Sequence, residues 1–290
     1  MKETPSSPGG MAGTSPSGRF RAGPLLALIG LTAVSLVFVY PFAWMFFASF
    51  KENRQIFSPL KLWPEHFGGQ YYGQLFSGEW IPFVRVFGNS LIIALAQAVG
   101  AVAVTSLAGY AFAKHRFPMR RMLFLLSLVV IVLPQQALAI SLFTWLDALH
   151  LSNRLAGVIL PGVVSGLGIL YFTQVFRQVP DDYVHLARMA GASEFRVYTT
   201  LLPMLTSPLL SFGLVQFILA WHEHLIPMLV LSAADQQTLP LALASLYGSS
   251  LRFPFAVLMA GSTLTLIPTI LLFGLLHRRF KSSLSELLVH

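Results

Sequence analysis

The sequence predicts an all-α membrane protein with six transmembrane helices. Among its 290 residues, 55% are hydrophobic and only 10% are charged, and the mean hydropathy is +0.70. A soluble domain usually carries about 25% charged residues, because its surface faces water. A chain with so little charge is expected to expose most of its surface to lipid. The absence of cysteine excludes disulfide bonds and thiolate metal sites.

Six segments are long and apolar enough to cross a bilayer, since a helical span needs about 20 mostly apolar residues. They comprise residues 24–50, 89–113, 122–146, 155–176, 208–231 and 255–276. Together they predict a membrane domain over residues 24–280. Residues 1–23 are rich in Pro, Gly and Ser, so we expect a disordered tail there, and residues 281–290 are expected to form a short second tail.

Six spans place both chain ends on one side of the membrane, and the basic residues select that side, because cytoplasmic loops are enriched in Lys and Arg. The side of the chain ends carries Lys2, Arg19, Arg21, Lys114, Arg116, Arg120, Arg121, Arg177, Arg188, Arg196, Arg278, Arg279 and Lys281. The opposite side carries only Lys51, Arg54, Lys61, Arg85, Arg154 and Arg252. Both ends are therefore expected in the cytoplasm. These residues cluster at the ends of apolar runs and form no stripe, so nucleic acid is not an expected partner.

A polar segment, "DDYVHLARMAGASEFRVYTTLLP" at residues 181–203, lies between the fourth and fifth spans. Pro180 ends the preceding span, and Asp181 is a suitable N-cap for a new helix. Gly191 can adopt a left-handed conformation and end that helix. Ser193 can cap a second helix, with Glu194 favourably placed in its first turn. The segment therefore predicts a helix, a glycine turn and a helix on the cytoplasmic side.

The bend between these two helices consists of small residues, Ala190, Gly191 and Ala192. Small side chains would let another protein approach the backbone closely. An amphipathic connector that lies flat on the membrane is an equally good interpretation of the same pattern.

The positions of Ala187, Gly191 and Leu202-Pro203 resemble the EAA loop of permease subunits from binding-protein-dependent ABC importers. Other stretches resemble the carbohydrate-importer branch of that family, in order along the chain, and the nearest type is the shorter permease of maltose-type importers. These stretches are "SFKENRQIF", "GNSLIIAL", "AGYAFAKHRFPMRRMLF", "NRLAGVILP", "AWHEHLIPMLVLS" and "QQTLPLALAS". His185, Leu186 and Ala190 depart from the usual Glu, Ala and Asp of the loop.

The resemblance implies a type I ABC importer permease fold in the bacterial inner membrane. It implies half of a translocation pathway for a sugar or sugar-like solute, beside a second homologous permease in a heterodimer. Two copies of an ATPase subunit and an extracytoplasmic solute-binding protein would complete the system. ATP and Mg²⁺ would bind to the ATPase, and this chain would hold no cofactor. The loop would contact the ATPase through His185, Arg188, Ala190, Gly191, Ala192 and Glu194.

The stretch "WHEH" at residues 221–224 invites a metal-site interpretation. His222, Glu223 and His224 are consecutive on a predicted helix, so neighbouring side chains point about 100° apart and a shared metal ion is not expected. Trp221 and Glu223 match the pattern of the resembling family. We therefore predict that they contribute to the translocation pathway, and a structural polar contact of Glu223 to another span is the alternative.

The third span contains "VLPQQALAI", in which Pro134 is expected to kink the helix and Gln135 could face a polar pathway. In the fourth span, "GVVSGLG" places small residues at intervals that favour close helix packing.

Two other classes of function remain as alternatives. A secondary transporter or channel would need no ATPase, but such proteins often carry several buried acids, and Glu223 is essentially the one acid here. An intramembrane metal enzyme would rely on "WHEH", whose spacing is unsuitable. The chain contains no phosphate-binding Gly-x-x-x-x-Gly-Lys-Ser/Thr sequence, so we expect no ATP hydrolysis by this chain and no enzymatic activity.

Overall fold

The computed structural model describes residues 22–57, 61–247 and 255–288, and this part of the chain is helical without a β-strand. Two compact units are present, Met1–Trp44 and Met45–His290. Helix α1 (Ala22–Ala48) begins in the first unit and ends in the second. The predicted tail at residues 1–23 lies outside the described residues except for its last two positions. The remaining predicted tail, residues 281–290, continues the last helix as far as Leu288.

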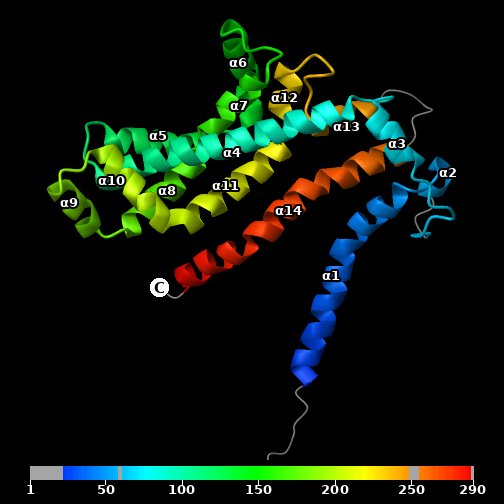
Figure 1. Cartoon of the computed structure of the whole chain (residues 1–290), viewed down its shortest axis with the longest axis horizontal. Coiled ribbons are helices and arrows are strands. Elements are labelled where there is room, and N and C mark those ends of the chain that lie inside the picture. The colour runs from blue at the N-terminus through cyan, green and yellow to red at the C-terminus, as the bar shows by residue number, and fades with distance from the viewer. Residues whose placement is uncertain (1–21, 58–60, 248–254, 289–290) are drawn as a thin grey trace, which may run out of the picture. The chain divides into compact units, whose positions relative to one another are not determined.

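The second unit contains long apolar helices and shorter connecting helices (Figure 1). In chain order they are α2 (Asn53–Ile56), α3 (Gln70–Ser77), α4 (Phe83–Lys114), α5 (Arg120–Val132), α6 (Gln135–Ala148), α7 (Leu155–Val163), α8 (Gly166–Gln178), α9 (Asp181–Met189), α10 (Glu194–Leu201), the 3₁₀ turn η1 (Leu202–Leu205), α11 (Thr206–Trp221), α12 (Leu225–Val230), α13 (Leu239–Tyr247) and α14 (Phe255–Leu288).

Four continuous helical stretches of the described chain are long and apolar enough to cross a membrane. They are Ala27–Ala48, Phe83–Lys114, Glu194–Trp221 and Phe255–Leu275. Two bent pairs pass the same test of length and composition: α5 and α6 meet at 111°, and α7 and α8 meet at 40°. The described chain therefore has four continuous candidate spans, and six if each bent pair counts as one span.

Two helical stretches differ in their bounds from the spans predicted in them. Helix α4 begins at Phe83 instead of residue 89. The continuous helical stretch that contains the predicted fifth span begins at Glu194, within the polar loop, and ends at Trp221 instead of residue 231. Pro203 and Pro208 do not interrupt the fifth span, because each lies at the start of a helical segment, η1 or α11. Proline is tolerated there, since the first amides of a helical segment have no carbonyl partner.

The two bends occur at prolines or just after them. Pro134 precedes α6, so the predicted kink of the third span is confirmed. In the fourth span Pro161 lies near the end of α7, and Ser165 caps the next helix by accepting a hydrogen bond from the Gly168 amide at 3.2 Å. The buried amides of Gln97 and Gln216 donate to carbonyls of α7, at 2.8 Å to Val158 and 3.1 Å to Gly162. These bonds satisfy polar groups of a helix that is broken inside an apolar environment.

Glycines allow α4 and α8 to pack closely. A Cβ atom added to Gly109 would lie 2.7 Å from the carbonyl carbon of Phe172 and 2.8 Å from the Thr173 nitrogen. A Cβ atom on Gly168 would meet Phe212 and Thr105 at 2.6 and 2.7 Å. The packing role predicted for "GVVSGLG" is therefore confirmed, since Gly162, Gly166 and Gly168 all lie against neighbouring helices.

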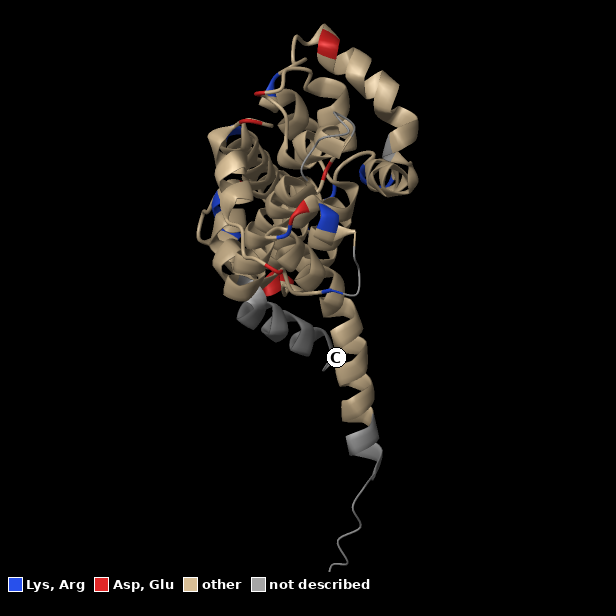
Figure 2. Cartoon of the chain, turned by 90° about the vertical axis from the view of Figure 1, so that its right-hand side faces the viewer, with Lys and Arg blue, Asp and Glu red and all other residues tan. Residues whose placement is uncertain are grey.

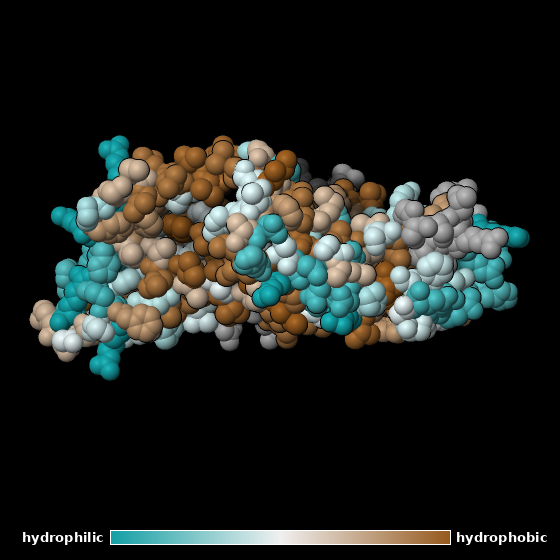
Figure 3. Space-filling view, turned by 90° about the horizontal axis from the view of Figure 1, so that it is seen from above, coloured by the Kyte–Doolittle hydropathy of each residue, from teal (hydrophilic) through white to brown (hydrophobic). Residues whose placement is uncertain are grey.

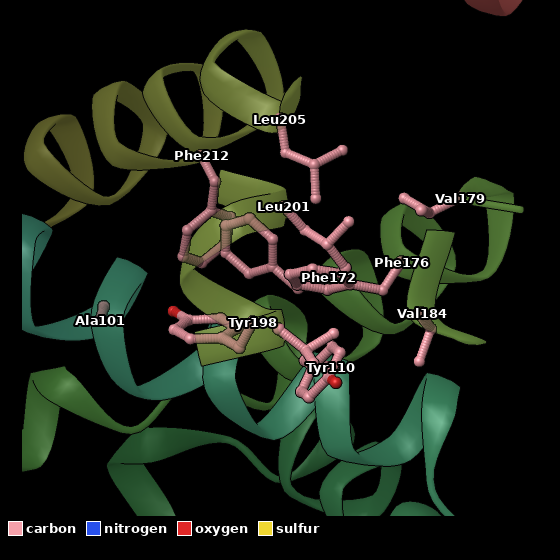
Figure 4. Close-up of a cluster of buried hydrophobic side chains, with 11 residues drawn as sticks. Ala101, Tyr110, Phe172, Phe176, Val179, Val184, Tyr198, Leu201, Leu205 and Phe212 are labelled. Atoms are coloured by element: carbon pink, nitrogen blue, oxygen red, sulfur yellow. The ribbon is translucent and has the colours of Figure 1, made fainter. Parts of the chain in front are cut away.

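One apolar cluster connects these helices to the loop at residues 181–203 (Figure 4). Phe172 and Phe176 of α8 are fully buried among aromatic side chains of α4, α10 and α11. Tyr110 and Tyr198 lie 5.6 Å apart between ring centroids. Val184 of α9 is also part of the cluster and only 2% exposed. Packing against the transmembrane core therefore fixes both helices of the loop.

The surface is apolar over long stretches of helix and hydrophilic near the ends of the second unit. Figure 2 shows few charged residues along the helices. Figure 3 shows hydrophilic side chains at the end that carries α9, around α2 and α3 at the opposite end, and in a further patch near the middle of this face. The apolar stretches between these regions are expected for helices that are surrounded by lipid along their length.

Gly109→Ala is expected to destabilise the fold, because the added methyl group meets backbone atoms of α8 that cannot move independently. We expect a loss of roughly 1–3 kcal/mol in the free energy of unfolding, as for other overpacked interiors. Gly88→Ala in the same helix is the control, since nothing lies within 4 Å of its added Cβ atom. Unfolding midpoints in detergent would check this prediction, and equal midpoints for the two variants would contradict it.

Candidate functional site

The loop at residues 181–203 forms a helical elbow between the fourth and fifth spans. Helices α9 and α10 meet at a turn in which Gly191 has a φ of +78°, so the predicted left-handed glycine is confirmed. The Gly191 amide donates to the Arg188 carbonyl at 2.9 Å, and the Ala192 amide donates to the Ala187 carbonyl at 3.1 Å. Ser193 caps α10 by accepting from the Arg196 amide at 3.4 Å, as predicted.

The start of α9 is tied to the end of α4. Pro180 occupies the N-cap position that was predicted for Asp181, and Asp181 is the first residue of the helix. The Asp181 carboxylate instead contacts Lys114 Nζ at 2.5 Å, and the same ammonium donates to the Val179 carbonyl at 2.6 Å. The hydrogen bond and charge of Lys114 lower the pKa of Asp181 below its usual value. Lys114 therefore joins the second span to the elbow through a charged contact that persists at neutral pH.

Glu194 connects the two helices of the elbow to α4. Its carboxylate accepts hydrogen bonds from Arg188 at 2.8 and 3.2 Å and from the Tyr110 hydroxyl at 3.0 Å. Its Oε2 atom also lies 3.1 Å from His115 Nε2. The bonds to Glu194 raise the pKa of Arg188 above its usual value. Tyr110 lies in α4 and His115 directly follows it, whereas Arg188 lies in α9 and Glu194 in α10. One carboxylate therefore links three helices. We call Tyr110, Lys114, His115, Asp181, Arg188 and Glu194 the elbow brace.

The sequence did not identify Tyr110, Lys114, His115 and Asp181 as members of one site. They are separated from their partners by 67 to 84 positions, as in the Lys114–Asp181 and Tyr110–Glu194 contacts. Short-range spacing carries no information about such pairs. The one local signal is the pair of i and i+6 residues Arg188 and Glu194, which only a sharp bend at Gly191 can bring together.

The outer side of the elbow exposes large apolar side chains. Val184 faces the core, whereas Leu186 is 63% exposed and Met189 is 83% exposed. Tyr183 and Phe195 flank them and are 49% and 67% exposed. We call Tyr183, Leu186, Met189 and Phe195 the elbow face.

The six residues predicted to contact an ATPase divide between these two features. His185, Ala190 and Gly191 are exposed beside the elbow face. Ala192 is partly buried and packs against the core cluster. Arg188 and Glu194 pair with each other inside the elbow brace. The elbow therefore has an exposed apolar side and a charged side whose residues contact the end of α4.

The stretch "WHEH" is not continuous helix, so the premise of its predicted geometry is wrong. Helix α11 ends at Trp221, and α12 begins at Leu225. Glu223 Oε1 accepts hydrogen bonds from the amides of Leu225 and Ile226 at 2.8 and 3.3 Å, and these bonds cap the N-terminus of α12. Pro227 in the first turn of α12 makes a separate helix favourable at this point. The described residues contain no group of three or more His, Cys, Asp or Glu side chains that could hold a metal ion.

The residues predicted to line a pathway are not brought together. Trp221 is 1% exposed, its indole nitrogen donates to the Thr265 carbonyl of α14 at 3.1 Å, and its ring stacks on Phe217. The hydrogen bonds of Glu223 join it to the neighbouring amides of Leu225 and Ile226 and not to another span. The side chain of Gln135 lies outside the described residues. The pathway roles of Trp221, Glu223 and Gln135 stay predictions.

Comparison with solved structures supports the fold. The chain is similar to a chain of a bacterial ABC transporter involved in the import of the acidic polysaccharide alginate, with a TM-score of 0.75. The similarity covers 93% of this chain and all of the other, at 18% sequence identity. At that identity the comparison establishes the arrangement of helices.

Curated relatives match almost the whole chain. The arabinooligosaccharides transport system permease protein AraQ of Bacillus subtilis is 30% identical over 261 residues, which cover 87% of this chain and 90% of the relative. AraQ of Halalkalibacterium halodurans is 29% identical over 278 residues, with coverage of 90% and 94%. The sn-glycerol-3-phosphate transport system permease protein UgpE of Brucella abortus is 28% identical over 272 residues, with coverage of 91% and 95%.

A family match covers most of the second unit, including the elbow. The family described as "Binding-protein-dependent transport system inner membrane component" matches residues 101–285, which is more than half of the chain. Family and relatives are transport permeases and not enzymes, and an importer of this kind requires an ATPase, a solute-binding protein and a second permease. The chain is a multi-pass permease subunit that belongs to the family of binding-protein-dependent transport system inner membrane components.

Proposed function

We propose that this chain forms half of the translocation pathway for a sugar or sugar-like solute and receives force from an ATPase through its elbow face. The observation that carries the proposal is the exposed apolar surface of Tyr183, Leu186, Met189 and Phe195 on a braced helical elbow. Exposed apolar side chains at a hydrophilic end of a membrane protein favour a protein partner, because water disfavours them there.

The brace is suited to transmit force from the elbow face. Asp181 is the first residue of α9 and contacts Lys114. Glu194 is the first residue of α10 and contacts His115 and Tyr110. Both helices of the elbow are therefore connected to the end of α4. Helix α10 continues through η1 into α11, so a displacement of the elbow reaches Trp221 along one helical stretch. Helix α4 packs against α7, α8 and α11, which form the centre of the unit. Motion of α9 is therefore coupled to the helices that would open or close a pathway.

The names of the relatives support the class of solute. They are permeases for arabinooligosaccharides, sn-glycerol 3-phosphate and lactose, and the similar solved transporter imports alginate. All of these solutes carry several hydroxyl groups. We infer a sugar or sugar-like solute for this chain, delivered by a solute-binding protein on the extracytoplasmic side.

The assembly would contain this chain, a second homologous permease in a heterodimer and two copies of the ATPase subunit, in a bacterial inner membrane. Cytoplasmic chain ends would place α9 on the side of the ATPase, and the excess of Lys and Arg on that side supports this orientation. ATP and Mg²⁺ would bind to the ATPase and not to this chain. His185 and Ala190, exposed beside the elbow face, would contribute to the contact.

Leu186→Asp is expected to weaken retention of the ATPase about 30-fold, because a charge would replace a central apolar contact of the interface. Affinity of the purified ATPase for the permease pair in nanodiscs measures this effect. Leu149→Asp is the matched control, since Leu149 is 48% exposed at the end of α6. Equal ATPase affinities for the two variants would contradict the assignment of the elbow face.

Glu194→Gln is expected to uncouple ATP hydrolysis from transport without releasing the ATPase. The substitution removes the charge that pairs with Arg188, so α9 would be coupled to α4 less firmly, through the Asp181–Lys114 pair and apolar packing. We expect the solute imported per ATP hydrolysed in proteoliposomes to fall about fivefold, at the lower end of ordinary coupling energies.

Glu79→Gln serves as the control for Glu194→Gln, since Glu79 is an exposed acid that lies before the second span. If Glu194→Gln released the ATPase as strongly as Leu186→Asp, Glu194 would be a docking contact instead of a brace. An unchanged transport-to-hydrolysis ratio would show that the brace is dispensable.

A further inference from the structure

A polar cavity of about 680 Å³ lies between the elbow and the connection from α4 to α5. Its walls include basic side chains from three places: Lys114 at the end of α4, Arg116 and Arg120 in the connection and the first turn of α5, and Arg188 on α9. Asp181 and Glu194 are the acidic residues of the wall, and His115 and His185 complete its titratable groups. Four Lys or Arg residues thus face two carboxylates.

The carboxylates are occupied by part of this positive charge. Asp181 pairs with Lys114 at 2.5 Å, and Glu194 pairs with Arg188 at 2.8 Å. Arg120 donates one hydrogen bond to the Phe112 carbonyl at 2.5 Å, and its other guanidinium N–H groups remain available as donors. The side chains of Arg116 and His185 make no hydrogen bond or ion pair with other described residues. The cavity therefore presents hydrogen-bond donors that have no partner in the described chain. They come from the α4–α5 connection and from α9.

Such a cavity fits an anion with several acceptor oxygens. Arginine binds phosphate groups through two parallel N–H donors, and two unpaired guanidinium groups can share one phosphate. The excess of two positive charges over the carboxylates favours a group of one or two negative charges. A solute that carries only hydroxyl groups would leave these charges uncompensated.

The cavity adjoins a surface that suits acyl chains. Arg120 begins α5, and the next turns of that helix expose Met122, Leu126 and Val129 by 60%, 54% and 52%. A phospholipid whose phosphate occupied the cavity could lay its acyl chains along this face. Basic pockets at the membrane surface, between helices, are known to favour anionic headgroups.

We propose that this cavity is a binding site for a phosphate group, supplied by the headgroup of an anionic phospholipid or by soluble phosphate. The phosphate would lie between the α4–α5 connection and α9, beside the elbow brace. A bound phosphate would add a further contact between these two walls. The composition of the membrane could thereby influence how firmly the elbow is held.

The assembled transporter, with its second permease and ATPase, is the material for the test. Native mass spectrometry would compare binding of phosphatidylglycerol and phosphatidylcholine that have identical acyl chains. We expect Arg116→Gln to lower the preference for phosphatidylglycerol about fivefold, and the Arg116→Gln, Arg120→Gln pair about 25-fold. Arg116→Lys retains the charge and is expected to restore most of the preference.

Arg121→Gln is the matched control, because Arg121 is an exposed neighbour that does not line the cavity. A second arm measures broadening of the ³¹P resonance of inorganic phosphate by the transporter in phosphatidylcholine nanodiscs. Broadening that Arg116→Gln abolishes, with an unchanged lipid preference, would identify soluble phosphate as the source. Loss of the phosphatidylglycerol preference alone would identify the lipid.

Two results would overturn the proposal. In the first, Arg116→Gln and Arg121→Gln bind both phosphatidylglycerol and inorganic phosphate equally well. In the second, Arg116→Gln releases the ATPase while phosphate and lipid binding are unchanged, which would mean that the cavity receives an acidic group of the ATPase. Variants are compared only as complexes of equal elution volume. Arg116 is exposed and makes no hydrogen bond or ion pair with described residues, so its substitution should leave the fold intact.

Discussion

The close packing of α4 against α8 is the constraint on which the rest of the structure depends. In lipid, helices gain little from burying apolar side chains, so association relies on close contact and on hydrogen bonds between helices. Gly109 permits that contact by omitting a side chain where it meets the backbone of α8, and Gly168 by leaving room for the side chain of Thr105. Because α4 also packs against α7 and α11, the position of this one helix determines where the broken fourth span and the elbow lie.

The elbow combines two surfaces that serve different purposes. Its inner side is charged and connects α9 and α10 to α4 through Lys114 and Glu194. Its outer side is apolar and exposed at Leu186 and Met189. An apolar outer side can bind and release a partner without breaking internal ion pairs. A charged inner side is directional, so it preserves the angle of the elbow while a partner moves it.

Much of this arrangement could be predicted from particular residues. Gly191 and Ser193 predicted the bend and the second cap, because positive φ and N-capping depend on local chemistry. Local reasoning failed to find the contacts of Glu194 within the chain, where it pairs with Arg188, and its predicted contact with an ATPase stays a prediction. It also failed at residues 221–224, where hydrophobicity suggested a longer helix than the one that forms. The contacts of Glu194 depend on how the packed fold brings distant residues together. The structure of residues 221–224 depends on where α11 ends.

The sequence by itself determined that the chain is a multi-pass membrane protein with a polar helical elbow, and its motifs placed it in a transporter family. Apolar length, charge distribution and turn residues are local properties, so they can be read without coordinates. Only the tertiary structure decided which side of the elbow faces outward, and which basic residues remain unpaired in the cavity behind it. Those outcomes depend on the contacts of Tyr110, Lys114 and His115 with the elbow. The packing of α4 against the other helices brings these residues to the elbow.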